Sequence, residues 1–361
     1  MQEDNLKYMV CPICSKSGLK LCDPVYDEHF GFPGEVVQGT VSCACGKKYY
    51  ISEYVLSLID AVTSCFSIED GEFWRKYYNQ LTEQGIDNFK DRTRPYHPFY
   101  EWGLDLSCSP DILIAAGAPG EEYLRMLNNH LLSNAKAGAK VLEIGCGAGW
   151  LSLEMARRGW RVHGIDTNLE SLKVAKQYSL NQGLLIEYVQ ADGGNPPFVS
   201  ETFHNIVAFH SLHHIPQLQG VFNRYKDMLM NGGLMIAYDH IRESKLGRYI
   251  QERYIRVLVK TLQVKNKPVF SFKSGYSFHE DVSLGQLNLA ERVFVKKHYE
   301  EEVYFLKFLP IFCYYIFGRS RLLLKTIRSV SDIISFIIGI IIPSTREFAL
   351  GFWMKNDREN S

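Results

Sequence analysis

The sequence lacks an excess of charge of either sign. Its 40 Lys and Arg residues are balanced by 40 Asp and Glu residues, which argues against a nucleic-acid binder held by a broadly basic face. Its 28 glycines and 13 prolines are too few for a collagen-like or low-complexity chain. Because 46% of the residues are hydrophobic and 22% are charged, the composition is that of a globular protein with a sizeable core.

The sequence also lacks an apolar run behind a basic start. Residues 1–9 contain Glu3, Asp4 and a single Lys7, so we predict no secretory signal and expect a cytoplasmic protein whose thiols stay reduced. Nine cysteines are too few for a disulfide scaffold. The length of 361 residues suggests two domains of about 150 residues each, with a small third module.

From residue 140 onward, short apolar runs alternate with helical patterns. The predicted strands are 140–144, 161–165, 186–190, 205–209 and 234–238, and the predicted helices are 150–158, 169–180 and 217–230. Sequential strand and helix units with right-handed crossovers predict an α/β fold with a doubly wound, mostly parallel sheet. Two later runs, 293–299 and 348–355, complete a sheet of seven strands.

A glycine loop joins the first predicted strand to its helix. The run from Val141 to Trp150 contains Gly145, Gly147 and Gly149. Glycine lets the backbone approach a ligand closely, and the amides at a helix N-terminus can receive an anionic group. Dinucleotide enzymes use a similar loop with different spacing, so the loop alone does not identify the ligand.

Together with the motifs after it, this loop resembles class I S-adenosylmethionine-dependent methyltransferases of the type 11 kind, which include ubiquinone and menaquinone biosynthesis enzymes. The resemblance covers about residues 140–240 and includes the turn Asn231-Gly232-Gly233. It implies a Rossmann-like fold in which Asp166 accepts hydrogen bonds from the cofactor ribose and Asp192 contacts the adenine amine. The cofactor-binding residues that it implies are Glu143, Gly145, Gly147, Gly149, Asp166, Asp192 and His210.

The two aspartates also have a purely local interpretation. Asp166 and Asp192 follow successive parallel strands, at the edge where doubly wound sheets bind ligands. The alternative is that each is a helix cap or a turn residue. Nearby, Asn195-Pro196-Pro197-Phe198 resembles a signature of enzymes that methylate amino groups of adenine or glutamine, but it precedes the predicted fourth strand and is better explained as a turn.

Three histidines, His210, His213 and His214, follow the fourth predicted strand. An alcohol acceptor needs a base near neutral pH, and histidine is the natural choice. The histidine pair resembles that of sugar and small-molecule O-methyltransferases. The resemblance implies that His213 or His214 is the base and that Asp239 orients it or contacts substrate. Alternatively, one histidine caps the following helix and the other packs; a metal site is disfavoured because no carboxylate is near in the sequence.

Four cysteines lie in two close pairs, Cys11-Pro12-Ile13-Cys14 and Cys43-Ala44-Cys45-Gly46. Four thiolates on two tight turns predict a tetrahedral structural zinc, which would fold a module too small to have its own core. The module resembles zinc ribbons found ahead of some methyltransferases, including a family of ribosomal RNA methyltransferases. It departs from them because one residue separates the second pair, so Cys22 is an alternative ligand and a ribbon without metal is the competing interpretation.

Two apolar stretches follow the core, 303–317 and 333–342. Both are shorter than the roughly 20 residues needed to cross a bilayer, so we predict no transmembrane helix. Arg319, Arg321, Lys325 and Arg328 lie between them. The stretches therefore form an insertion, residues 303–345, that rests on an anionic bilayer, roofs an apolar substrate pocket, or is buried in the protein or a dimer interface.

These patterns divide the chain into a zinc-ribbon-like module (1–60), a helical connector or substrate cap (61–118), a cofactor-binding core (119–245) and a C-terminal part with the last two strands (246–361). The predicted activity is methyl transfer to a small or amphiphilic metabolite, with oxygen acceptors slightly favoured. The alternatives are a ribosomal RNA methyltransferase and a non-catalytic cofactor-binding scaffold subunit. The acceptor and the oligomeric state have no sequence signal.

Overall fold

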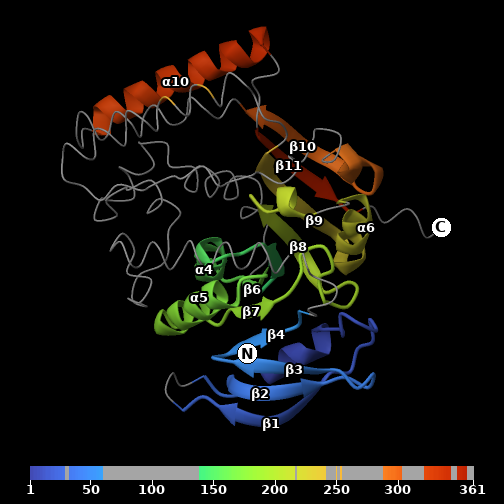
Figure 1. Cartoon of the computed structure of the whole chain (residues 1–361). Coiled ribbons are helices and arrows are strands. Elements are labelled where there is room, and N and C mark those ends of the chain that lie inside the picture. The colour runs from blue at the N-terminus through green and yellow to red at the C-terminus, as the bar shows by residue number, and fades with distance from the viewer. Residues whose placement is uncertain are drawn as a thin grey trace.

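The computed structural model describes residues 1–28, 32–59, 138–215, 218–240, 288–302, 321–342 and 348–355, together with Tyr249 and Arg253. In these ranges the strands form one eleven-stranded sheet in the order β1-β2-β3-β4-β7-β6-β5-β8-β9-β11-β10 (Figure 1). The predicted connector 61–118 and the apolar stretch 303–317 lie outside the described residues.

Seven of the strands make up the predicted doubly wound sheet. They are β5 (Lys140–Ile144), β6 (Arg161–Asp166), β7 (Glu187–Gln190), β8 (Phe203–Phe209), β9 (Leu229–His240), β10 (Val295–Glu302) and β11 (Phe348–Met354). The strands β7, β6, β5, β8 and β9 run parallel, whereas β11 is antiparallel to both β9 and β10. The predicted fold class is confirmed, although β9 begins five residues earlier than the apolar pattern indicated, at Leu229 instead of residue 234.

Helices cover both faces of this sheet. The helices α4 (Trp150–Arg157) and α5 (Leu169–Asn181) lie on one side, and α6 (Leu218–Met228) lies on the other (Figure 1). Alternate residues of β5 supply the two cores: Val141 packs in one cluster with Leu151, while Leu142 packs in the other with Phe222. Because both faces are buried, apolar residues occur on both sides of the central strands instead of alternating with polar ones.

Local signals set the ends of the helices. The residue after the α4 C-cap, Gly159, has φ of +84°, a left-handed conformation that glycine adopts without a steric penalty. The α5 helix begins after Asn168, whose side-chain oxygen accepts the backbone N–H groups of Glu170 and Ser171. Both signals come from residues next to the helix ends, and the second places a fixed turn directly after Asp166.

The first 59 residues extend the same sheet. A 3-10 helix, η1 (Glu3–Tyr8), precedes the strands β1 (Lys20–Tyr26), β2 (Val36–Ser42), β3 (Lys48–Ser52) and β4 (Val55–Ser57). The strands β1 to β4 are an antiparallel meander, and β4 then pairs in parallel with β7. The core on the α6 side continues into these strands. This segment is therefore joined to the central sheet by backbone hydrogen bonds as well as by apolar packing.

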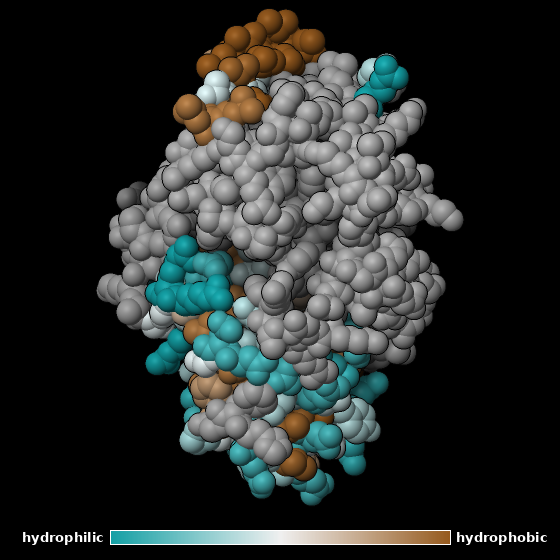
Figure 2. Space-filling view, turned by 90° about the vertical axis from the view of Figure 1, so that its left-hand side faces the viewer, coloured by the Kyte–Doolittle hydropathy of each residue, from teal (hydrophilic) through white to brown (hydrophobic). Residues whose placement is uncertain are grey.

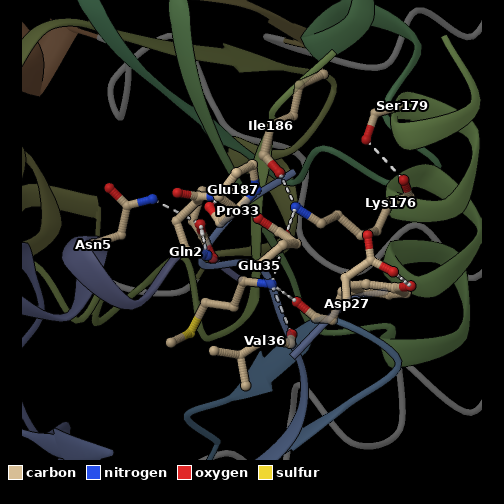
Figure 3. Close-up of polar contacts among 12 residues, drawn as sticks. Gln2, Asn5, Asp27, Pro33, Glu35, Val36, Lys176, Ser179, Ile186 and Glu187 are labelled. Atoms are coloured by element: carbon tan, nitrogen blue, oxygen red, sulfur yellow. Dashed lines mark hydrogen bonds and ion pairs between the residues drawn. The ribbon is translucent and has the colours of Figure 1, made fainter. Parts of the chain in front are cut away.

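A buried cluster of charges ties the same segment to α5 (Figure 3). Glu35 is fully buried and pairs with the amino group of Met1, at 2.7 Å, and with Lys176 of α5. Lys176 Nζ also donates to the carbonyl of Ile186 at 2.8 Å. Burial works against charge on Glu35, but Lys176 and the Met1 amino group outweigh it and lower the pKa of Glu35 to about 2. Removing either group would leave buried Glu35 with one cationic partner in place of two, which weakens the compensation of its charge.

The second predicted apolar stretch is the C-terminal half of α10 (Arg321–Ile341), which lies between β10 and β11 in the chain. The predicted insertion before the last strand is thus present. Across the described ranges, none of the helices is long and apolar enough to cross a membrane.

Candidate functional site

The glycine loop between β5 and α4 takes a backbone conformation that glycine favours. Gly145, Gly147 and Gly149 have φ of +68°, +51° and +80°. A Cβ at Gly145 would lie 2.5 Å from Cβ of Ser211, and a Cβ at Gly149 would lie 2.3 Å from the hydroxyl of Tyr188. Conformation and packing therefore both require glycine at these two positions.

Asp166, the last residue of β6, holds this loop. Its Oδ2 accepts the backbone N–H of Gly147 at 2.8 Å, and its Oδ1 accepts the N–H of Asn168 at 2.8 Å. Burial raises the pKa of Asp166, against the lowering effect of the Asn168 and Gly147 amides. Each carboxylate oxygen has two acceptor positions, so the bonds seen leave capacity for ligand hydroxyls. The structure thus brings Asp166 and the glycine loop together.

Asp192 lies near Asp166 at the same edge of the sheet. Asp166 is paired with Gln190 across β6 and β7, and Asp192 follows Gln190 by two residues. Its Oδ1 accepts the backbone N–H of Gly194 at 2.7 Å, which closes a local turn. This hydrogen bond agrees with the interpretation of Asp192 as a turn residue. The position of Asp192 at the carboxyl edge of the sheet agrees with a ligand-binding role.

Glu143, another predicted cofactor residue, lies on β5 directly before the loop. It is buried on β5 and accepts a hydrogen bond from the hydroxyl of Ser152 on α4. Burial, together with the nearby charge of Asp166, raises the pKa of Glu143 to about 8, although the Ser152 hydroxyl lowers it. The carboxyl is therefore mostly protonated at neutral pH. Its observed contact fastens α4 to β5.

His210 directly follows β8 and has a positive φ of +49°, which is uncommon for a residue other than glycine. Its ring centroid lies 4.5 Å from that of Phe209 and 5.3 Å from that of Tyr238, both edge to face. Burial lowers the pKa of His210 to about 4, although the charge of Asp239 raises it. The ring is therefore neutral at physiological pH.

The structure distinguishes between the two neighbouring histidines. His213 Nδ1 lies 2.6 Å from Asp239 Oδ1 on β9, while the other carboxylate oxygen accepts the backbone N–H groups of Ser211, at 3.0 Å, and Leu212, at 2.6 Å. The ring of His214 lies 3.9 Å from that of His213. Both His213 and Asp239 are buried. A carboxylate that holds one ring nitrogen fixes the orientation of the imidazole and directs the other nitrogen.

The four predicted zinc ligands converge. Within the described residues, the sulfur atoms of Cys11, Cys14, Cys43 and Cys45 lie within 4.8 Å of one another. The Cys11 and Cys45 sulfurs are 3.7 Å apart, and those of Cys14 and Cys43 are 3.5 Å apart. Four thiolates at about 2.3 Å from one tetrahedral zinc would be about 3.8 Å apart. The arrangement therefore fits zinc, and Cys22 lies apart from it, with its thiol 3.4 Å from the Ser42 hydroxyl.

Sequence reasoning missed how the cysteine turns meet the loop after Asp192. The backbone N–H of Val10 donates to the Pro197 carbonyl at 3.0 Å, and that of Val199 donates to the Tyr8 carbonyl at 2.9 Å. The Pro-Pro turn thus lies between β7 and β8, as predicted, and contacts the segment that leads into Cys11. These are backbone contacts between distant segments, for which the residue types give no signal.

Comparison with known proteins agrees with this geometry. Residues 141–233 match the family model described as a methyltransferase domain. A ubiquinone biosynthesis O-methyltransferase of Aliivibrio fischeri is 34% identical over 143 residues, which cover 38% of this chain and 56% of that protein. A sterol 24-C-methyltransferase of Gibberella zeae is 28% identical over 191 residues, which cover 50% of this chain and 49% of that protein.

The chain spans about half the length of these curated relatives. Among solved structures, phosphoethanolamine N-methyltransferase 2 of Haemonchus contortus, in complex with S-adenosylmethionine, is 16% identical with a TM-score of 0.45, over 75% of this chain and 60% of that chain. The family match and the sequence relatives cover the strands and loops that carry the predicted cofactor site. Residues 141–233 therefore match a methyltransferase domain, in agreement with the class I S-adenosylmethionine-dependent methyltransferases that the sequence motifs resemble.

Proposed function

We propose that this chain binds S-adenosylmethionine at the carboxyl edge of β5, β6 and β7 and transfers a methyl group to a small or amphiphilic acceptor. The observation that carries the proposal is the contact of Asp166 with the Gly147 amide. It joins the carboxylate that would bind the cofactor ribose to the glycine loop that would lie against the methionine part of the cofactor. Asp192 would contact the adenine amine. The neutral ring of His210 would lie beside the sulfonium without electrostatic repulsion.

The bound cofactor supplies an electrophilic methyl group on a sulfonium. For a hydroxyl acceptor, Nε2 of His213 would take the hydroxyl proton as the acceptor oxygen receives the methyl group, and the cofactor would leave as the neutral thioether. The Asp239 contact with Nδ1 supports this assignment, because it directs Nε2 and stabilises the imidazolium. The named O-methyltransferase relative supports an oxygen acceptor, and the sterol relative, a C-methyltransferase, makes carbon the alternative atom.

The test separates binding from chemistry. We expect His213→Gln to lower kcat by about 10²–10⁴-fold while the cofactor affinity, measured by calorimetry, stays within about twofold. The matched variant His214→Gln should keep most of its activity, because it leaves the hydrogen bond between His213 and Asp239 in place. Full turnover in His213→Gln would remove the base assignment. Failure of well-folded wild-type protein to bind the cofactor would remove the whole proposal.

The acceptor class can be found by transfer of a tritiated methyl group into cell fractions sorted into RNA, protein, lipid and small molecules. We expect label in lipid or small molecules. Label in RNA would favour the ribosomal RNA alternative, to which the cysteine module points and which the balanced charge disfavours. Absence of label together with cofactor binding would favour the scaffold alternative.

We also propose that Cys11, Cys14, Cys43 and Cys45 hold a structural zinc ion. The support is the sulfur separations, together with the chemistry of four soft thiolate donors. Because all four positions would be filled by protein, the ion would stabilise structure and leave no site for a substrate. Metal analysis of purified protein should find one zinc per chain.

A further inference from the structure

The helix α10 presents its apolar side away from the protein. Among the α10 residues whose burial is described, Ser331 and Gly339 are buried, so the side that carries them rests on the molecule. Large apolar side chains on the remaining surface are exposed, among them Phe336 at 71% and Ile340 at 57%. The exposed large apolar residues from position 330 to position 342, just past the end of the helix, are Val330, Ile333, Ile334, Phe336, Ile337, Ile340, Ile341 and Ile342. Figure 2 shows these side chains gathered at one end of the molecule.

The apolar face of α10 is as wide as the side of a surface helix that normally packs against a protein core. The exposed residues come in adjacent pairs, 333–334, 336–337 and 340–341, so the face is broader than the single a and d seam of a coiled coil. An exposed apolar patch of this kind marks an interaction site on a folded protein. A face of this width is better matched to the flat surface of a lipid bilayer than to a single partner helix.

The polarity of α10 changes along its length. Its first half carries Arg321, Lys325 and Arg328 beside the exposed apolar Leu322 and Leu323, whereas no charged residue occurs from 333 to 342. At 1.5 Å per residue, that apolar half is about 15 Å long, half of the roughly 30 Å hydrocarbon core of a bilayer. Basic residues in one half of an exposed helix and only apolar or small residues at the end of the other half suit the boundary where anionic headgroups meet acyl chains.

We propose that α10 docks on the surface of a lipid bilayer, with its apolar face at the acyl boundary and its basic half among anionic headgroups. Arg328 Nε lies 3.8 Å from Asp332 Oδ2, so part of the positive charge is already compensated and apolar burial supplies most of the binding. This surface is separate from the cofactor site. The proposal therefore goes beyond methyl transfer and holds for any acceptor.

The experiment is flotation of the full chain with vesicles of phosphatidylcholine and phosphatidylglycerol in equal parts. The wild type should float, and the double variant Phe336→Glu, Ile340→Glu should bind at least about tenfold more weakly, because two large apolar contacts are lost. The matched control is Leu185→Glu, an exposed apolar residue between α5 and β7, which should float like the wild type. Vesicles of phosphatidylcholine alone should bind less protein.

Several results would overturn the proposal. One such result is that the wild type stays at the bottom of the gradient. Another is that the double variant floats as much as the wild type. If light scattering instead showed a dimer that the double variant dissociates, with no flotation, the face would be an interface between copies. Thermal unfolding of the same proteins shows whether the variants fold. Cofactor calorimetry shows whether they still bind the cofactor, so a failure of lipid binding is distinguished from a failure of the proposed methyl transfer.

Discussion

The two ends of the sheet are attached to the molecule in opposite ways. At the N-terminal end, the segment with β1 to β4 buries charged groups against α5 and β7, and each main charge has a partner. At the C-terminal end, α10 buries little and leaves large apolar side chains exposed. One end thus places polar groups inside, and the other places apolar groups outside.

This contrast has a physical meaning. Buried charges that are fully paired are costly to separate, because each partner would be left in a medium of low polarity. The N-terminal segment should therefore stay fixed to the methyltransferase domain. Exposed apolar groups gain free energy only when something covers them. The C-terminal helix should therefore act through a partner, whereas the N-terminal strands act on the domain itself.

The largest expected effect comes from the cysteine cluster at the N-terminal end. Cys14→Ser should lose the zinc ion and lower the free energy of unfolding of the N-terminal segment by several kcal/mol, since structural zinc contributes about 10–16 kcal/mol in zinc-finger peptides. Metal analysis and urea unfolding measure both. Cofactor affinity should also fall, because the segment before Cys11 contacts the loop after Asp192.

The matched control for this variant is Cys22→Ser, a cysteine of the same segment that lies outside the cluster. It should keep the metal and the stability of the wild type. Retention of both by Cys14→Ser would show that the four thiols do not act as a metal site, and the N-terminal end would then depend on its buried charges alone.

The second-largest expected effect concerns the buried charges at the N-terminal end, and two lysines of α5 test it. Lys176→Met should cost about 3–5 kcal/mol in urea unfolding, because Glu35 loses a buried partner. Lys173→Met, one turn earlier on α5, should cost under about 1 kcal/mol, because Lys173 pairs with the exposed Glu53 and Glu170. Equal losses in the two variants would contradict the idea that buried pairing fixes this end of the sheet.

The sequence predicted the parts of this molecule that depend on neighbouring residues. The strands, the Asn168 cap and the glycine loop follow from local patterns, and the spacing of the cysteines predicted their convergence. The Glu35 and Lys176 pair has no such signal, because a lysine in a helix with an amphipathic pattern is usually exposed and its partner comes from a distant strand. The same limit applies to β4, whose three residues carry no periodicity, and to the choice between His213 and His214, which depends on which ring meets Asp239.

The buried carboxyl of Glu143 can be compared with that of Glu35, whose charge is stabilised by buried cations. The pKa of Glu143 is raised to about 8 by burial, above its ordinary value of 4.5, so its stabilising contribution is full below about pH 4.5 and is lost as the pH rises through about 8. Between pH 6 and 8 the wild type should lose about 2 kcal/mol relative to Glu143→Gln, which has no proton to release. Urea unfolding at several pH values measures this difference. Parallel pH profiles would mean that Glu143 is charged in the folded protein, like Glu35.

The smallest expected effect lies at the C-terminal end. Ile340→Ala should change the free energy of unfolding by less than about 0.5 kcal/mol, because Ile340 is exposed and its removal opens no cavity. The same substitution at Ile51 of β3, which is buried, should cost about 2–5 kcal/mol. Urea unfolding of both variants compares identical chemistry at the two ends of the sheet. If Ile340→Ala cost as much as Ile51→Ala, the apolar face of α10 would be covered in the folded chain, and neither the contrast between the two ends nor the docking of α10 on lipid would stand.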